Sequence, residues 1–191
     1  MRALALSLLL AASVAASAQP TRPASGPAVD LLVDLAVEYG GDDVVTLVFT
    51  DGDTQTLRAG QGITAAGGVR VAPVPTVPLA LHATVGYKAV FNASSNSDLR
   101  LTRIPIEVGA AYYVTPDVWL GAGYVMHTAT RLHADGLGPD VDFDTAHGAT
   151  VEAGWRWIGA SVTAIGYTDE FGNDYDASSV GVTFRYGFPI R

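Results

Sequence analysis

Residues 103–127, RIPIEVGAAYYVTPDVWLGAGYVMH, alternate in character on both sides of a Pro116-Asp117 turn. The even-numbered positions before and after the turn are apolar, whereas the odd-numbered ones include Arg103, Glu107, His127 and several glycines. Side chains of a β-strand point alternately to opposite faces, so a period of two on both sides of a tight turn predicts an antiparallel hairpin. One continuous apolar face opposed by charges is typical of a transmembrane β-barrel, with lipid outside and a polar lumen inside.

The same alternation recurs in six further segments, and their links differ in length. Links after the first, third, fifth and seventh segments are long and polar, those after the fourth and sixth are short, and a proline-rich turn, residues 72–78, follows the second. This asymmetry is typical of outer-membrane barrels, which have short periplasmic turns and longer extracellular loops. The sequence therefore predicts an all-β fold, an antiparallel eight-stranded transmembrane up-and-down β-barrel over residues 30–188 with both termini on the periplasmic side. The six segments are residues 30–39, 62–71, 79–89, 145–156, 158–167 and 178–188.

Composition sets limits on the class of protein. The 191 residues suffice for one domain, and the absence of cysteine leaves no disulfide or thiolate metal site. A formal net charge of −8 argues against nucleic-acid binding. Apolar residues make up 49% of the chain, yet no apolar run after residue 18 approaches the roughly 20 residues of a membrane-spanning helix.

The N-terminus resembles an export signal. Arg2 precedes an apolar run from Ala3 to Val14, and Ala16-Ser17-Ala18 is a small-x-small cleavage site. We expect residues 1–18 to be a cleaved signal peptide, with a membrane anchor as the alternative, and residues 19–29 to be a periplasmic leader. The expected location is the cell outer membrane of a Gram-negative bacterium, in contact with outer-membrane lipid and lipopolysaccharide.

Residues 43–58 contain Asp51-Gly52 between two β-prone runs, which is a strong hairpin signal. They are predicted to project beyond the bilayer as a two-stranded extension. Its exposed strand edges could pair with a protein partner, and a simple structural extension is equally compatible.

Aromatic residues gather beside the proposed short turns, where a barrel carries one of its two interfacial belts. A soluble β-sandwich or lipocalin-like barrel is the alternative, because a period of two does not distinguish them. The predicted belt consists of Tyr112, Tyr113, Trp119, Trp155, Trp157, Tyr186 and Phe188.

With the signal peptide, the hairpin IPIEVGAAYYVTPDVWLGAGY and the final strand SSVGVTFRYGF, the chain resembles a small eight-stranded outer-membrane β-barrel protein of the OmpX-like and OmpW-like type. The resemblance implies that the barrel assembly machinery reads an aromatic at the end of the last strand. Phe188 resembles that residue, although Pro189-Ile190-Arg191 follow it.

The inward face predicted by parity is charged. An eight-stranded barrel is only wide enough for side chains to fill it, and an unpaired buried charge is costly. We therefore expect a paired network that plugs the lumen, with a proton or ion path, or a catalytic site, as the alternative. The predicted network is Asp34, Glu38, Arg70, Lys88, Arg103, Glu107, Glu152, Arg156 and Arg185, with His82 and His127 on the same face.

The sequence gives less support to a catalytic or metal site than to a plugged lumen. No serine is evidently placed beside any of the four histidines, and nucleophilic hydrolysis would need such a pair. Two acidic loops, residues 134–144 and 169–176, offer oxygen ligands, but neither matches the EF-hand spacing. We expect no catalytic residue, metal or cofactor.

The predicted function is a structural or surface-interaction role for a monomeric barrel plugged by paired charges. The first alternative is a narrow channel for small hydrophobic or ionic solutes, as the OmpW-like resemblance implies. The second is an outer-membrane lipid hydrolase or acyltransferase that modifies lipid A.

Overall fold

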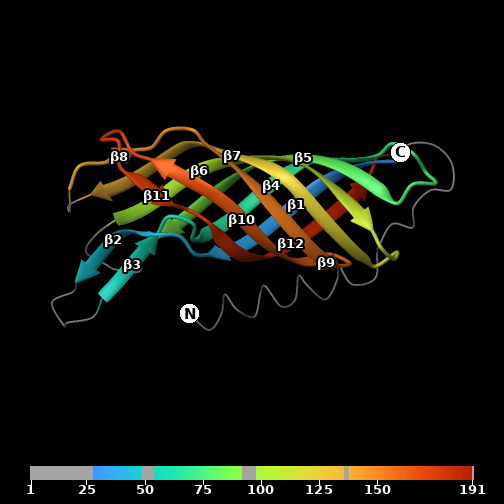
Figure 1. Ribbon diagram of the computed structural model, residues 1–191, viewed down its shortest axis with the longest axis horizontal. Helices are drawn as coiled ribbons and strands as arrows, with labels where there is room; N and C mark the ends of the chain where they lie inside the picture. Colours follow the sequence, from blue (N-terminus) through green and yellow to red (C-terminus); the bar gives the residue numbers. More distant parts are fainter. Residues whose placement is uncertain (1–27, 49–53, 92–97, 136–137, 191) are drawn as a thin grey trace.

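The computed structural model describes residues 28–48, 54–91, 98–135 and 138–190 (Figure 1). The predicted signal peptide and most of the predicted leader lie outside these residues. None of the described residues forms a helix long and apolar enough to cross a membrane.

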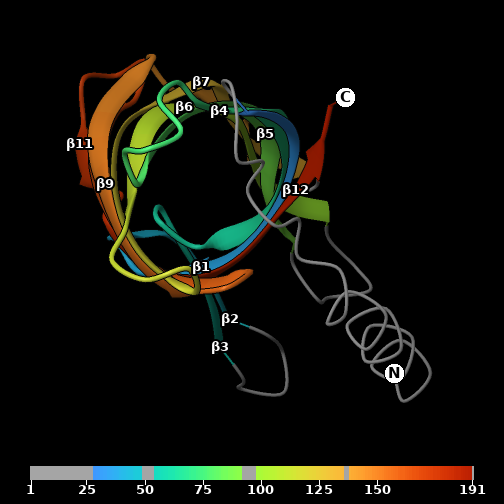
Figure 2. The same cartoon turned by 90° about the vertical axis from the view of Figure 1, so that its right-hand side faces the viewer.

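Eight strands form a closed ring. Each pairs antiparallel with the next, and the last pairs with the first to close the barrel, which Figure 2 shows end-on. This confirms the predicted all-β, antiparallel up-and-down architecture. In order around the ring, the strands are β1 (Ala28–Tyr39), β4 (Gly62–Ala72), β5 (Leu79–Phe91), β6 (Asp98–Tyr113), β7 (Val118–Asp135), β9 (Ala146–Trp155), β10 (Ile158–Thr168) and β12 (Ser179–Pro189).

The barrel has two different ends. The links β4–β5, β6–β7 and β9–β10 lie at one end together with the start of β1 and the end of β12, and we call this the turn end. The opposite end carries β2 (Asp43–Val48), β3 (Thr54–Arg58), β8 (Val141–Asp142) and β11 (Asp174–Asp176), and we call it the loop end (Figure 1).

β6 and β7 extend further toward the loop end than the sequence predicts. Their register shifts where Thr102 pairs with Arg131 and Ile104 pairs with Thr128, so β7 carries an extra residue there. Ala129 has a φ of 51°, which fits a β-bulge at this point. Residues 134–142, predicted as a loop, contain the end of β7 and the short strand β8.

β2 and β3 form a two-stranded sheet of their own outside the ring (Figures 1 and 2). The base of this hairpin is held to the barrel, because Asp42 N donates to Asp176 O at 2.7 Å and Asp176 N donates to Asp42 Oδ2 at 2.8 Å. Gly41 has a φ of 81°, and a Cβ on it would lie 2.6 Å from Gly60 N. Glycine at position 41 therefore allows both the turn and the close approach.

Burial follows the alternation along the wall. In β1, Leu31, Val33 and Leu35 are about half exposed, whereas Leu32 and Asp34 between them are buried. The outer wall is thus apolar and the interior holds most of the charge, as a barrel surrounded by lipid requires.

Candidate functional site: the barrel interior and the loop end

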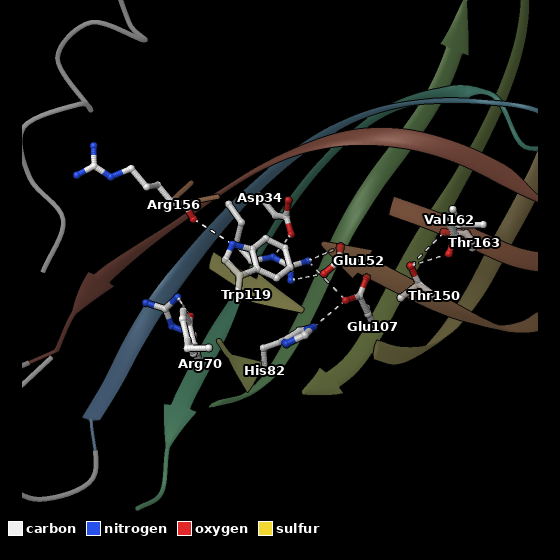
Figure 3. Close-up of polar contacts among 12 residues, drawn as sticks. Asp34, Arg70, His82, Glu107, Trp119, Thr150, Glu152, Arg156, Val162 and Thr163 are labelled. Carbon is white, nitrogen blue, oxygen red and sulfur yellow. Dashed lines mark hydrogen bonds and ion pairs between the residues drawn. The ribbon is translucent and has the colours of Figure 1, made fainter. Parts of the chain in front are cut away.

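One arginine and three carboxylates meet in the middle of the interior. Arg185 Nε donates to Asp34 Oδ2 at 2.7 Å, and its Nη1 donates to Glu152 Oε2 at 2.8 Å. Arg185 Nη2 lies 3.5 Å from Glu107 Oε1. Figure 3 shows Asp34, Glu107 and Glu152 converging from different strands. We call this group the central cluster.

His82 completes the central cluster from β5. Its Nε2 lies 2.7 Å from Glu107 Oε1 (Figure 3). A Cβ on Gly109 would lie 2.7 Å from His82 Cε1, so the glycine on the neighbouring strand leaves the space that the imidazole occupies.

A second polar layer lies nearer the loop end. Lys88 is 1% exposed, pairs with Glu38 at 2.9 Å, and donates to Gly60 O at 2.9 Å. Arg103 is completely buried, and its guanidinium lies over the Tyr167 ring, 5.7 Å from the centroid. Among the described residues, no carboxylate lies within ion-pair distance of Arg103.

An apolar cluster fills the loop end of the interior above this layer. Leu57 is 1% exposed and brings a side chain of the β2–β3 hairpin into the cluster. Hydrophobic burial therefore ties the base of the hairpin to the barrel. The other buried members are Ala59, Val90, Leu99, Leu101, Val125, Leu132, Ala134, Phe143, Ala146, Ile165, Tyr167 and Ala177.

Large side chains also occupy the turn end. Trp119 is 5% exposed, and its indole N–H donates to Arg156 O at 3.1 Å. Arg70 donates to Asp30 Oδ2 at 2.6 and 2.9 Å and to Tyr113 Oη at 2.9 Å.

A small polar cavity lies between the central cluster and the second layer. Its volume is about 60 Å³, and its lining includes Asp34, Glu38, Lys88, Glu107 and Arg185. This volume has room for a few water molecules and for nothing larger than a small ion.

The structure places Asp34, Glu38, Arg70, Lys88, Arg103, Glu107, Glu152 and Arg185 of the predicted network in the interior. The placement of Arg156 in the lumen is wrong. Arg156 has a φ of 56°, lies in the β9–β10 turn, and pairs with Asp117 at 3.3 Å outside the lumen.

Two members of the predicted aromatic belt point inward. Trp119 is buried in the turn end and Tyr113 is bonded to Arg70, so neither lies on the outer wall. Tyr112, Trp155 and Phe188 are each about half exposed on that wall. Trp157 stacks on Phe184, and Tyr186 packs edge-on against Phe188.

Asp30 and the apolar cluster are interior features that the sequence reasoning missed. Asp30 shares the parity of Asp34, and this signal could have found it. The apolar cluster draws on several strands and on the hairpin, and no local pattern brings these parts together.

The acidic loops use their carboxylates as structural acceptors. Asp140 accepts from His133 Nδ1 at 2.9 Å and from Ala134 N at 3.1 Å, and these hydrogen bonds hold the pKa of Asp140 below its usual value. Asp169 accepts from the backbone N–H groups of Phe171 and Asn173. Asp140 and Asp169 thus bond to the chain itself.

Each of the four histidines has an identified partner. His82 is bonded to Glu107, His127 to Tyr167, His133 to Asp140 and His147 to Tyr124. None of these partners is a serine, so the described residues offer no serine–histidine pair for hydrolysis.

Comparison with known proteins gives one family and several structural neighbours. Residues 4–188 match the family described as outer membrane protein beta-barrel domain. No curated protein matches.

The structural neighbours are distant in sequence. Ail, the attachment invasion locus protein of Yersinia pestis, is 11% identical with a TM-score of 0.42, covering 85% of this chain and 99% of Ail. Ail in complex with the heparin analogue sucrose octasulfate is 10% identical with a TM-score of 0.41, covering 85% of this chain and 100% of Ail. A chain from a de novo design of transmembrane β-barrels is 14% identical with a TM-score of 0.30, covering 88% of this chain and 100% of the design.

Proposed function

The chain belongs to the outer membrane protein β-barrel domain family, and we propose that it is a closed barrel whose loop end is an interaction surface. In this proposal the loop end faces the outside of the cell and the turn end faces the periplasm. The outer wall contacts lipid and lipopolysaccharide, and the interior serves stability rather than transport.

Three levels of packing support a closed interior. The apolar cluster lies at the loop end, the charged side chains lie in the middle, and Trp119 lies at the turn end. The cavity between the polar layers is about 60 Å³, far below the bore of a water-filled channel.

Single-channel recording in planar bilayers tests this half of the proposal. We expect the refolded barrel to give no steady conductance steps, while a porin added afterwards to the same bilayer gives its usual steps. Steps that scale with the amount of barrel would favour the narrow channel instead.

The proposal that the loop end is an interaction surface rests on the β2–β3 sheet. This sheet lies outside the ring, and the buried Leu57 fixes its base. Within the described residues the two strands pair only with each other. Each therefore has an outer edge with backbone groups that an added strand could pair with.

The charge of the loop end indicates the kind of partner. Its exposed acids include Asp43, Asp142, Asp144, Glu170 and Asp174. Phe171, in the β10–β11 turn, is 70% exposed and offers an aromatic contact at the same end. A basic, extended segment of a partner protein fits both the strand edges and the acidic surroundings.

A pair of synthetic peptides tests this partner chemistry. An octapeptide that alternates Lys and Val should bind the folded barrel in vesicles at least tenfold more tightly than its Glu-Val counterpart, and added NaCl should weaken it. Replacing residues 47–55 by Asn-Gly shortens the hairpin while keeping Leu57, and this variant should lose the preference. Thr145→Ala is the matched control for the hairpin and should keep the preference, since Thr145 is exposed between β8 and β9 at the same end and belongs neither to the strand edges nor to the acids. Equal binding of both peptides, or binding that survives the shortened hairpin, would contradict the proposal.

A further inference from the structure

The charges of the central cluster do not balance. Arg185 is the one permanent cation within ion-pair distance of Asp34, Glu107 and Glu152 among the described residues. Lys88, the next cation, is already paired with Glu38. With a neutral His82, three carboxylates and one guanidinium leave an excess of two negative charges. An interior with uncompensated charge is unstable unless something else neutralises it.

The geometry of three side chains suits a metal ion. One ligand atom each from His82, Glu107 and Glu152 lie within 4.8 Å of one another. They come from β5, β6 and β9, so the wall of the barrel fixes their backbones independently. Tetrahedral zinc ligands lie about 3.3 Å apart, at Zn–N and Zn–O distances of about 2.0–2.2 Å. To reach that arrangement, the Glu152 carboxylate must turn away from Arg185, whose Nη1 donates to it at 2.8 Å.

Two orphaned polar atoms point to a missing partner in the same place. Asp34 Oδ1 and Thr183 Oγ1 are buried without a hydrogen-bond partner, in side chains that are 7% and 5% exposed. Both residues line the 60 Å³ cavity together with Glu107 and Glu152. Buried polar groups are normally satisfied, so these two atoms call for an ion or ordered water.

We propose that His82, Glu107 and Glu152 bind a divalent transition-metal ion inside the barrel. Two carboxylates, a neutral imidazole and a divalent cation form a neutral unit. Arg185 is then left with Asp34, its partner at 2.7 Å, as a second neutral unit. Asp34 and Thr183 line the cavity, so that Asp34 Oδ1 can accept from a water on the metal and Thr183 Oγ1 can donate to one.

The ligand types select the class of metal. An imidazole nitrogen with two carboxylates suits zinc and its transition-metal neighbours, whereas calcium and magnesium favour oxygen ligands alone. Zinc is therefore the probe for the test, and cobalt is its spectroscopic substitute.

The packing above and below the cluster determines when the metal enters. The apolar cluster lies on the loop-end side of the central cluster, and the buried Trp119 lies on its turn-end side. A metal ion therefore binds while the barrel folds and is then retained. Metal sites that form only in the folded chain couple binding to folding.

The experiment refolds the whole mature barrel in detergent with either equimolar zinc or EDTA, removes free metal, and measures bound zinc by mass spectrometry. We expect one zinc ion per chain and a higher thermal midpoint than after refolding in EDTA. His82→Gln and, separately, Glu152→Gln should retain less than a tenth of that zinc. His133→Gln is the matched control, because His133 is bonded to Asp140 at the loop end, and it should retain zinc fully.

Cobalt absorption distinguishes the interior site from metal bound by carboxylates of the loops. Refolding with cobalt should give the visible absorption bands of cobalt with a low coordination number in the wild type and in His133→Gln. His82→Gln should show none of these bands. A correctly folded wild-type barrel that retains no zinc would overturn the proposal, as would zinc retained by His82→Gln and lost by His133→Gln. These outcomes are independent of whether the loop end binds a partner.

Discussion

Trp119 occupies, inside the barrel, the space that the absent side chain of Gly154 leaves on the paired strand. The two residues are register partners on β7 and β9, and a Cβ on Gly154 would lie 2.3 Å from Trp119 Cε2. Gly154→Ala therefore forces the indole away from the turn end, and we expect a loss of about 1–3 kcal/mol in the free energy of unfolding. Urea unfolding in lipid vesicles measures it. Gly67→Ala is the control, because a Cβ there meets no atom closer than 3.8 Å, and its unfolding midpoint should not fall.

Arg185 pairs with the three carboxylates that surround it, so Arg185→Met should be strongly destabilising. Removing one partner of a buried ion pair typically costs about 3–5 kcal/mol, because the remaining charge is buried without compensation. The same urea experiment measures the loss. Arg131→Met is its control, since Arg131 pairs with Asp140 at the surface with 54% of its side chain exposed. A loss for Arg185→Met no greater than for Arg131→Met would contradict the central role of this residue.

Leu57 links the hairpin to the barrel, so Leu57→Ala should destabilise the barrel and not merely the hairpin. Truncating a buried leucine costs about 2–5 kcal/mol. The effect should appear as a lower unfolding midpoint that is the same for barrel and hairpin probes. Thr46→Ala, at an exposed hairpin position bonded to Thr56, should change the midpoint little. Separate transitions for hairpin and barrel would show that the two are not one cooperative unit.

Val108 lies midway along the outward row of β6 from Ile104 to Tyr112 and is 57% exposed. In the membrane this position faces the lipid core, where an arginine costs about 2–4 kcal/mol. Val108→Arg should lower stability by that amount in vesicles. Phe171→Arg, at the loop end, should have almost no effect. Equal tolerance of both substitutions would argue that the middle of this wall faces water.

Asp140 should titrate below pH 3.8, its usual pKa, because the hydrogen bond from His133 and then that from Ala134 N favour the ionised carboxylate. A lowered pKa in the folded state means that the stabilisation is complete above pH 3.8 and is lost as the pH falls through the lowered value. Carboxyl ¹³C shifts of Asp140 measure the midpoint. His133→Gln should move it up toward 3.8, and a wild-type midpoint at or above 3.8 would contradict the hydrogen bonds.

The walls of the barrel could be predicted from the sequence, because the face to which each side chain of a strand points follows from the alternation of neighbouring residues. Leu31 and Asp34 differ in parity, and this alone separates lipid from lumen. Arg156 and Trp119 were misplaced for different reasons. Arg156 was assigned to the lumen by parity, but it lies in a two-residue turn with positive φ, where alternation ends. Trp119 was assigned by its closeness to the turn, although its parity and the glycines opposite it favour the interior.

The way the loop end packs into the barrel could not be predicted, because it depends on contacts between segments far apart in the sequence. The bulge at Ala129 shifts the parity of β7, so that Leu132 points inward beyond it although His127 does so before it. Ala129 itself gives no sign of this. Leu57 reaches the interior only because the hairpin folds back at Gly41 and Gly60. Arg185 meets its three carboxylates across the interior of the closed ring. Alternation along a strand predicts that these side chains point inward, but it does not predict which of them meet.

The pairing of β1 with β12 determines the order of events in assembly. Asp34 and Arg185 are 151 residues apart and meet across the seam where the ring closes. Of the strand pairs in the ring, β1–β12 and β10–β12 require the last strand, whereas the pairs from β1–β4 to β9–β10 need only earlier parts of the chain. Until then the sheet has two open edges, whose backbone groups lipid cannot satisfy. We therefore expect insertion and closure to be coupled, and the Asp34–Arg185 salt bridge across the seam to be among the last contacts that form.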